Sequence, residues 1–314
     1  MIRDASGGAR GEASKPSAVL IVNPNAGRIS ERVRSEVVAA LRTRFHLEAF
    51  ATTGRDSGIG LAAQAAEAGV RLVIAFGGDG HVNEVANGLA GSASVLGIVP
   101  GGTMNVFSRA LGIPQDPFDA IDHMVGRLDR DAREVPLGRM DDRYFTFSAG
   151  CGFDAEAAER VERYVPAKRR FGELFFYWSA FRVLAGSYRH RNPSMTLKGD
   201  FGELDVAMAI ASNAGPYAYL AGRAIKIAPE VRLEAGIDLF ALKTMRIENL
   251  PVYAYRCVVS RDLVDHQDAF YVNDQEWFEL RADRPFSRHV DGEPLPPARS
   301  ARFTSVRDIL KVVA

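Results

Sequence analysis

The chain of 314 residues has few cysteines, no excess of either charge and no long hydrophobic run. Its 39 basic residues equal its 39 acidic residues, which argues against a nucleic-acid binder because phosphate-backbone affinity needs surplus Lys and Arg. The longest apolar stretches, residues 70–76 and 174–184, are interrupted or shorter than the roughly 18 residues of a membrane span. The two cysteines, Cys151 and Cys257, fit no metal-binding spacing, so we expect buried small apolar residues in a reducing cytosol.

The N-terminal residues mix Gly, Ser, Ala and charged residues without the apolar core of a signal peptide. We therefore expect a flexible tail at residues 1–17. The rest, in a chain with 47% hydrophobic and 25% charged residues, is typical of a globular protein with two domains. We place the first domain at residues 18–136, with residues 298–314 returning to it, and the second domain at residues 137–297.

Short β-branched runs and helical patterns alternate in the first domain, which is typical of a parallel sheet covered by helices. Strands are predicted at residues 18–22, 45–51, 71–76 and 95–99, with Ser30 and Asp56 as candidate helix N-caps. Strand-like pieces follow at residues 144–148, 194–197, 204–211, 237–242 and 277–280. The fold class is therefore α/β, with an N-terminal Rossmann-like parallel-sheet domain and a C-terminal, mainly antiparallel β-sandwich domain.

Three glycine-containing junctions each follow a predicted strand. They are NPNAG at residues 23–27, GGDG at 77–80 and PGGTMN at 100–105. Unpaired backbone N–H groups and a helix N-terminus at such a junction favour an anion such as phosphate. A single junction of this kind is equally well explained as a tight turn that needs positive φ. Neither the G-x-x-x-x-G-K-[ST] phosphate loop nor the G-x-G-x-x-G dinucleotide pattern occurs, so a nucleotide site of another kind is predicted.

As a set, four motifs resemble the diacylglycerol kinase catalytic-domain family, which includes soluble bacterial lipid kinases and the sphingosine and ceramide kinases. They are VNPNAG at residues 22–27, GGDGHVNEV at 77–85, PGGTMN at 100–105 and VDGE at 290–293. The GGDG core alone is shared with NAD kinases and phosphofructokinases, so the resemblance rests on the whole set. It covers nearly all of the chain after the N-terminal tail.

The resemblance implies an ATP-dependent lipid kinase with Mg²⁺ bridging the phosphates and a lipid hydroxyl as acceptor. The motif positions that would contact the nucleotide are Asn23, Gly27, Arg28, Thr52, Gly77, Gly78, Asp79, Gly80, Asn83 and Thr103. Asp79 would also hold Mg²⁺ through water, and Glu293 would be the general base that activates the hydroxyl. Without the resemblance, residues 291–294 would be interpreted as a polar turn.

Three positions depart from the family pattern. Bacterial relatives commonly have an Asp where this chain has Val106, and often a metal-binding Asp where it has Ala235. We therefore expect no metal at the second position. His81 replaces a frequent Thr, and either caps a helix, which we favour, or hydrogen-bonds a phosphate.

A run of aromatic and apolar residues at helical spacing, with basic flanks, spans residues 171–184. It is interpreted as a core helix or as an amphipathic element that meets the lipid. We expect a cytoplasmic protein that acts on a lipid substrate at a membrane surface, peripheral on the inner face. We expect no nucleic-acid partner and no transmembrane span. The sequence does not decide between a monomer and a homodimer. The rival functions are an NAD kinase-like phosphotransferase and a non-catalytic nucleotide-binding regulator.

Overall fold

The computed structural model describes residues 15–24, 26, 29–128, 132–153, 155–156, 195–220, 223–245 and 247–314. Gly27, Arg28 and the aromatic run at residues 171–184 lie outside these ranges. The first half contains β1 Ser17–Val22, α1 Glu31–Arg44, β2 His46–Ala51, α2 Ser57–Glu67, β3 Leu72–Gly77, α3 Asp79–Leu89, β4 Val95–Pro100, α4 Val106–Ala110 and α5 Pro117–Val125.

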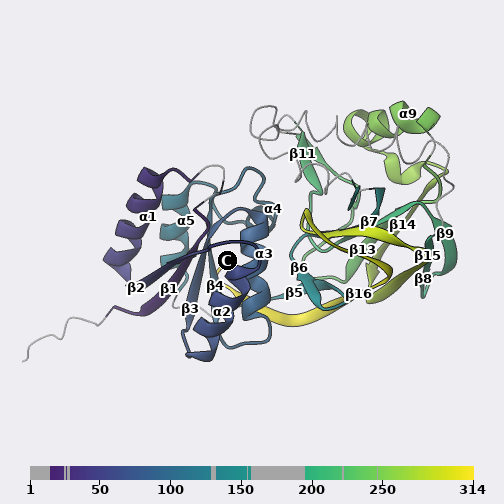
Figure 1. Ribbon diagram of the computed structural model, residues 1–314. Coiled ribbons are helices and arrows are strands. Elements are labelled where there is room, and N and C mark those ends of the chain that lie inside the picture. Colours follow the sequence, from purple (N-terminus) through teal and green to yellow (C-terminus); the bar gives the residue numbers. More distant parts are fainter. Residues whose placement is uncertain are drawn as a thin grey trace, which may run out of the picture.

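The strands of the first half form a parallel sheet in the order β4-β3-β1-β2 (Figure 1). β1, β3 and β4 are apolar on both faces because both faces are covered, whereas β2, at the edge of the sheet, is mostly exposed. Val19 and Ile21 of β1 point to the core beneath α2 and α3, and Leu20 and Val22 point to the core beneath α1 and α5. Burial on both sides explains why these strands are continuous apolar runs rather than alternating patterns.

The two predicted N-caps have different outcomes. Ser30 caps α1, because its side chain accepts a hydrogen bond from the Val33 N–H at 3.2 Å. Asp56 occupies the N-cap position of α2, as predicted, but its side chain makes no capping bond. The buried carboxylate of Glu84 caps α2 instead and accepts from the N–H groups of Asp56 and Gly58, each at 2.8 Å. A carboxylate at a helix N-terminus also complements the helix dipole.

The second half is built from antiparallel strands. It contains β5 Arg133–Met140, β6 Arg143–Phe145, β7 Ser148–Gly152, β8 Met195–Gly199, β9 Gly202–Val206, β10 Met208–Ser212, β11 Ala218–Leu220, β12 Arg223–Ile225, β13 Ile237–Leu242, β14 Ala269–Gln275, β15 Trp277–Val290 and β16 Glu293–Val312, with α9 Leu250–Tyr255 and the helical turns η2 Ile247–Asn249, η3 Arg256–Ser260 and η4 Leu263–Asp265. The strand predicted at residues 204–211 is divided between β9 and β10. The predicted fold class, a parallel α/β part followed by antiparallel strands, is confirmed.

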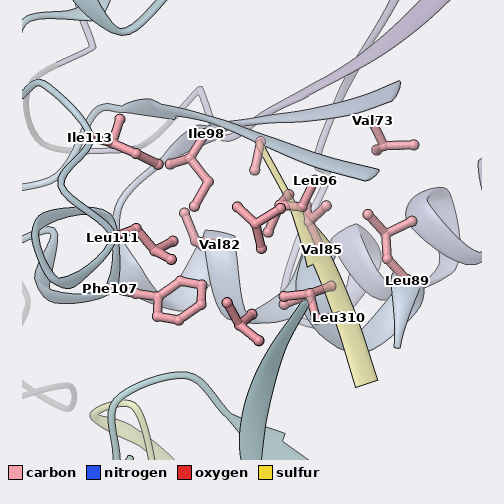
Figure 2. Close-up of a cluster of buried hydrophobic side chains, with 14 of the residues drawn as sticks. Val73, Val82, Val85, Leu89, Leu96, Ile98, Phe107, Leu111, Ile113 and Leu310 are labelled. Carbon is pink, nitrogen blue, oxygen red and sulfur yellow. The ribbon is translucent and has the colours of Figure 1, made fainter. Parts of the chain in front are cut away.

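One long strand connects the two halves. β16 pairs with β15 along its first part and with β4 at Lys311 and Val312 (Figure 1). Leu310 of this strand packs among side chains of α3, α4 and β4, including Val85, Phe107 and Leu96 (Figure 2). The last strand therefore completes the core of the first half.

Candidate active site

Three loops meet where β1, β3 and β4 end. The N–H of Asn23, directly after β1, donates to the Phe76 carbonyl at 3.1 Å, and the N–H of Gly101, directly after β4, donates to the Gly77 carbonyl at 2.7 Å. The chain leaves β1 for α1 on one face of the sheet and leaves β3 for α3 on the other face. Such a change of face at the carboxyl ends of parallel strands is where open α/β sheets bind ligands.

Close backbone contact, rather than left-handed backbone conformation, explains the glycines of these loops. None of Gly77, Gly78 and Gly80 has positive φ, so the tight-turn interpretation of GGDG is wrong. A Cβ added to Gly102 would lie 2.5 Å from the Cα of Gly78, closer than real Cβ atoms approach. The second and third loops therefore pack backbone against backbone, and side chains at these positions would push them apart.

Asp79 is the first residue of α3, directly after the N-cap Gly78. Its Oδ1 accepts a long hydrogen bond of 3.4 Å from the N–H of Phe107. Burial, and secondarily the negative charge of Asp291, raise the pKa of Asp79 to about 6. Because its charged form is disfavoured, this carboxylate would be stabilised by a nearby cation.

The donor set here fits a cation that arrives with phosphate groups. In the part of the chain that the structure describes, no three His, Cys, Asp or Glu side chains are grouped so that they could hold a metal ion. Mg²⁺ usually keeps several waters and takes one or two carboxylates together with substrate phosphates. The single carboxylate of Asp79, beside three loops at a sheet edge, matches that requirement.

Glu293 comes from the far end of the sequence and lies against the first turn of α3. It begins β16, after a turn in which Asp291 and Gly292 have φ values of 47° and 80°. A Cβ added to Gly80 would lie 2.3 Å from Oε1 of Glu293, so this glycine leaves the room that the carboxylate occupies. The fold thus places the carboxylates of Asp79 and Glu293 at the same helix N-terminus.

Asp291 is a residue that the sequence interpretation missed as a separate element of the site. It is buried, and its Oδ2 accepts from Asn83 Nδ2 at 2.8 Å and from the Thr146 N–H and hydroxyl, each at 2.7 Å. Its Oδ1 accepts from the N–H groups of Phe147 and Ser148 at 3.0 and 2.9 Å. Burial raises the pKa of Asp291, and these hydrogen bonds oppose that shift. Asp291 therefore joins α3 to the strands of the second half, two residues before Glu293.

The other predicted nucleotide contacts are distributed unevenly. Asn23 and Thr103 lie in the loops after β1 and β4, and Thr103 is exposed. Thr52, directly after β2, is buried and its N–H donates to the Val22 carbonyl at 2.9 Å. Asn83 is also buried, and its amide donates to the Tyr144 carbonyl as well as to Asp291, both at 2.8 Å. Asn83 thus holds the two halves together, whereas Gly27 and Arg28 lie outside the described residues.

The three positions that depart from the family pattern have structural environments of their own. His81 does not cap α3, because its Nε2 lies 2.9 Å from the Ile21 carbonyl, and burial lowers its pKa. Val106 is fully buried in the core of the first half. Ala235 precedes Gly236, whose N–H donates to Asp274 Oδ1 at 2.6 Å.

Comparisons with known proteins concern first the fold and then the sequence. A structure from Bacillus anthracis superposes with a TM-score of 0.72 at 23% identity, covering 95% of this chain and 96% of that one. A second, described as the crystal structure of a diacylglycerol kinase from the same organism, has a TM-score of 0.65 at 20% identity, with the same coverage of 95% and 96%. This chain therefore shares its fold, a parallel α/β part followed by antiparallel strands, with these two structures.

The sequence comparisons match part of the chain to a family model and most of it to named relatives. The model of the diacylglycerol kinase catalytic domain matches residues 17–140. A Bacillus subtilis protein named "Diacylglycerol kinase" is 29% identical over 88% of this chain and 92% of its own length. A Chromohalobacter salexigens protein named "Probable lipid kinase YegS-like" is 28% identical over 88% of this chain and 86% of its own length. Residues 17–140 of this chain therefore match the diacylglycerol kinase catalytic domain, and most of the chain is similar to proteins named as lipid kinases.

Among the described residues, no helix has both the length and the apolar character that crossing a lipid bilayer requires.

We predict that Asp79→Asn stabilises the protein at neutral pH. The folded-state pKa of about 6 lies above the ordinary value of 3.8, so this carboxyl makes the free energy of unfolding fall as pH rises between those values. In urea denaturation with EDTA at pH 7.5, the variant should gain about 2 kcal/mol, and its advantage should shrink toward pH 4. Asp283→Asn, at an exposed position, is the control and should change little. Equal stability of Asp79→Asn and the unaltered protein at pH 7.5 would show that burial does not disfavour the charged Asp79 side chain.

We also predict that Asn83→Ala lowers the free energy of unfolding by about 2 kcal/mol, because the buried Asp291 carboxylate and the Tyr144 carbonyl each lose a donor. The matched control is Asn273→Ala, which removes an exposed hydrogen bond to Glu230 and should cost less than about 0.5 kcal/mol. Chemical denaturation measures both values. A loss for Asn83→Ala no larger than that of the control would show that this amide does not hold the halves together.

Proposed function

We propose that this protein is an ATP-dependent lipid kinase that transfers the γ-phosphoryl group to a hydroxyl of diacylglycerol or a related lipid, including sphingoid and ceramide-like lipids. The observation that carries the proposal is the meeting of Asp79 and Glu293 at the N-terminus of α3, although they come from distant parts of the chain. A metal-organising acid and a proton acceptor at one helix end are what phosphoryl transfer to an alcohol requires.

Each group has a role that follows from its position. The loops after β1, β3 and β4 would contact the phosphates through backbone N–H groups, with help from the positive end of the α3 dipole. Asp79 would hold Mg²⁺ through water, and the ion would neutralise charge on the phosphates. Glu293 would orient the lipid hydroxyl and take its proton as the oxygen attacks the γ-phosphorus, while the bond from that phosphorus to the β–γ bridging oxygen breaks and ADP leaves. Asp291 and Asn83 would fix the distance between α3 and the turn that carries Glu293.

The lipid acceptor implies that the enzyme works at a membrane surface, and we place it in the cytoplasm, peripheral on the inner face. In this proposal Gly27 and Arg28 would belong to the loop that contacts the phosphates, and Thr52, Thr103 and Gly77 would line the nucleotide site. Asn83 is reassigned from the nucleotide to the contact with Asp291, because both donors of its amide are used within the protein.

Two alternatives make different predictions. An NAD kinase-like phosphotransferase would share the GGDG core but has no need of the VDGE turn. That turn supplies both Asp291 and Glu293 to the site. A non-catalytic nucleotide-binding regulator would not need Glu293 held over Gly80. The position of Glu293 therefore favours the lipid kinase over both.

A single assay separates the three functions. The protein is incubated with γ-labelled ATP and Mg²⁺, and offered diacylglycerol, ceramide, sphingosine, total lipid extract and NAD in parallel. Transfer of label to a lipid supports the proposal. Label that moves only to NAD selects the NAD kinase, and nucleotide binding without transfer to any acceptor selects the regulator.

We predict that Glu293→Gln lowers kcat by about 10²–10⁴-fold, the usual contribution of a general base, and leaves KM for ATP nearly unchanged. Glutamine has the same shape, so loss of the proton acceptor is isolated from loss of packing. Glu276→Gln, at an exposed position between β14 and β15, serves as control and should retain full activity. A kcat for Glu293→Gln within about threefold of the unaltered protein would remove Glu293 from the mechanism.

Gly80→Ala should lower kcat while the protein stays folded. The new methyl group would lie 2.3 Å from Glu293 Oε1, and a flexible carboxylate moves more easily than backbone, so the proton acceptor is displaced. We expect a decrease of about 10²-fold, the effect of misplacing a reacting group by about 1 Å. Gly60→Ala, in the interior of α2 with no atom within 4 Å of the added carbon, is the matched control. Steady-state kinetics and circular dichroism of both variants check the prediction, which fails if the two glycine variants behave alike.

A further inference from the structure

A partly buried arginine faces the proposed general base from the second half of the molecule. Arg143 begins β6, a strand that lies beside α3 (Figure 1). Its Nη2 lies 3.9 Å from Oε2 of Glu293, and its Nη1 donates to Asp56 Oδ1 at 2.9 Å. The guanidinium therefore lies between a carboxylate of the proposed site and a carboxylate at the start of α2.

The two oxygens of Glu293 have different surroundings. Oε1 occupies the space above Gly80, and Oε2 faces Arg143. A second arginine, Arg55, donates to the carbonyl of Pro294, the residue directly after Glu293. The turn that carries Glu293 is thus contacted by two arginines, one from the loop before α2 and one from β6.

We infer that Arg143 is a positioning residue for the lipid kinase reaction, one that orients the Glu293 carboxylate. This inference rests on the proposed function. A guanidinium 3.9 Å from one carboxylate oxygen restricts how that carboxylate can turn, and a proton acceptor must be held in the right geometry to act. Asp56 accepts a hydrogen bond from the other side of the guanidinium. The guanidinium therefore keeps its orientation when Glu293 takes up the proton.

The guanidinium of Arg143 is held by carboxylates rather than by the main chain. Only 17% of its side chain is exposed, its partners are Asp56 and Glu293, and its Nε has no hydrogen-bond partner among the described residues. Arg288 provides the contrast, because it has the same exposure of 17% but pairs with Asp141 and donates from Nε to the Pro296 carbonyl at 2.7 Å.

The test is a double-mutant cycle in the labelled-ATP assay, with diacylglycerol in mixed micelles. Arg143→Gln should lower kcat by about 10-fold or more and change KM for ATP by less than about threefold, because orientation of the base affects the chemical step. In the Glu293→Gln background the same change should have less than about a twofold effect, since two residues that act through one another are not additive. Arg143→Lys should recover part of kcat by restoring the charge.

Arg288→Gln is the matched control and should retain kcat within about twofold. Unchanged kcat in Arg143→Gln, or equal factors for Arg143→Gln with and without Glu293, would overturn the inference while leaving the kinase itself in place. If circular dichroism shows that Arg143→Gln is unfolded, Arg143→Lys is used in its place. A partial decrease in kcat that disappears in the Glu293→Gln background supports the inference. Any other result for Arg143→Lys overturns it. Absence of lipid phosphorylation by the unaltered protein would overturn the proposed function and this inference with it.

Discussion

The arrangement of the site depends on one buried carboxylate. Asp291 is buried, so its oxygens need donors within the protein, and the structure supplies them from α3 and from the segment between β6 and β7. Removing a buried charged group from its donors costs several kcal/mol, which makes this contact a strong constraint on how the two halves meet. Glu293 is only two residues further along the chain. The contacts of Asp291 therefore also fix the position of Glu293 beside Gly80.

The main chain reinforces what the carboxylate specifies. Because β16 belongs to the ladders of both halves, one strand connects the turn at its start with the parallel sheet at its end. The site therefore lies between two supports, a polar one at Asp291 and a strand along the edge of the first core. Both the acid at the start of α3 and the acid at the start of β16 are located by regular elements rather than by free loops, and sites built on such elements are held more precisely.

The sequence predicts β1, β3 and β4 well because each is a short apolar run that ends at turn-forming residues, and local pattern determines such elements. The same pattern correctly predicts that the three glycine junctions lie at the carboxyl ends of β1, β3 and β4. The reason for the glycines was not predictable, since Gly78 faces Gly102 and Gly80 faces Glu293 only in the folded chain. Glu84 and Arg143 were missed for the same reason. Their partners are 26 or more residues away, and no short motif records a contact across that separation.

The position of Leu310 has a consequence for how the protein is made. The core of the first half contains Leu310 and Val312 beside residues from β1, α3 and β4. A ribosome adds residues from the N-terminus onward, so the first half must wait, with part of its apolar interior uncovered, until more than 300 residues have been joined. During translation this half would be an unfinished intermediate, and its exposed sheet edge beside β4 would be the surface most in need of a chaperone.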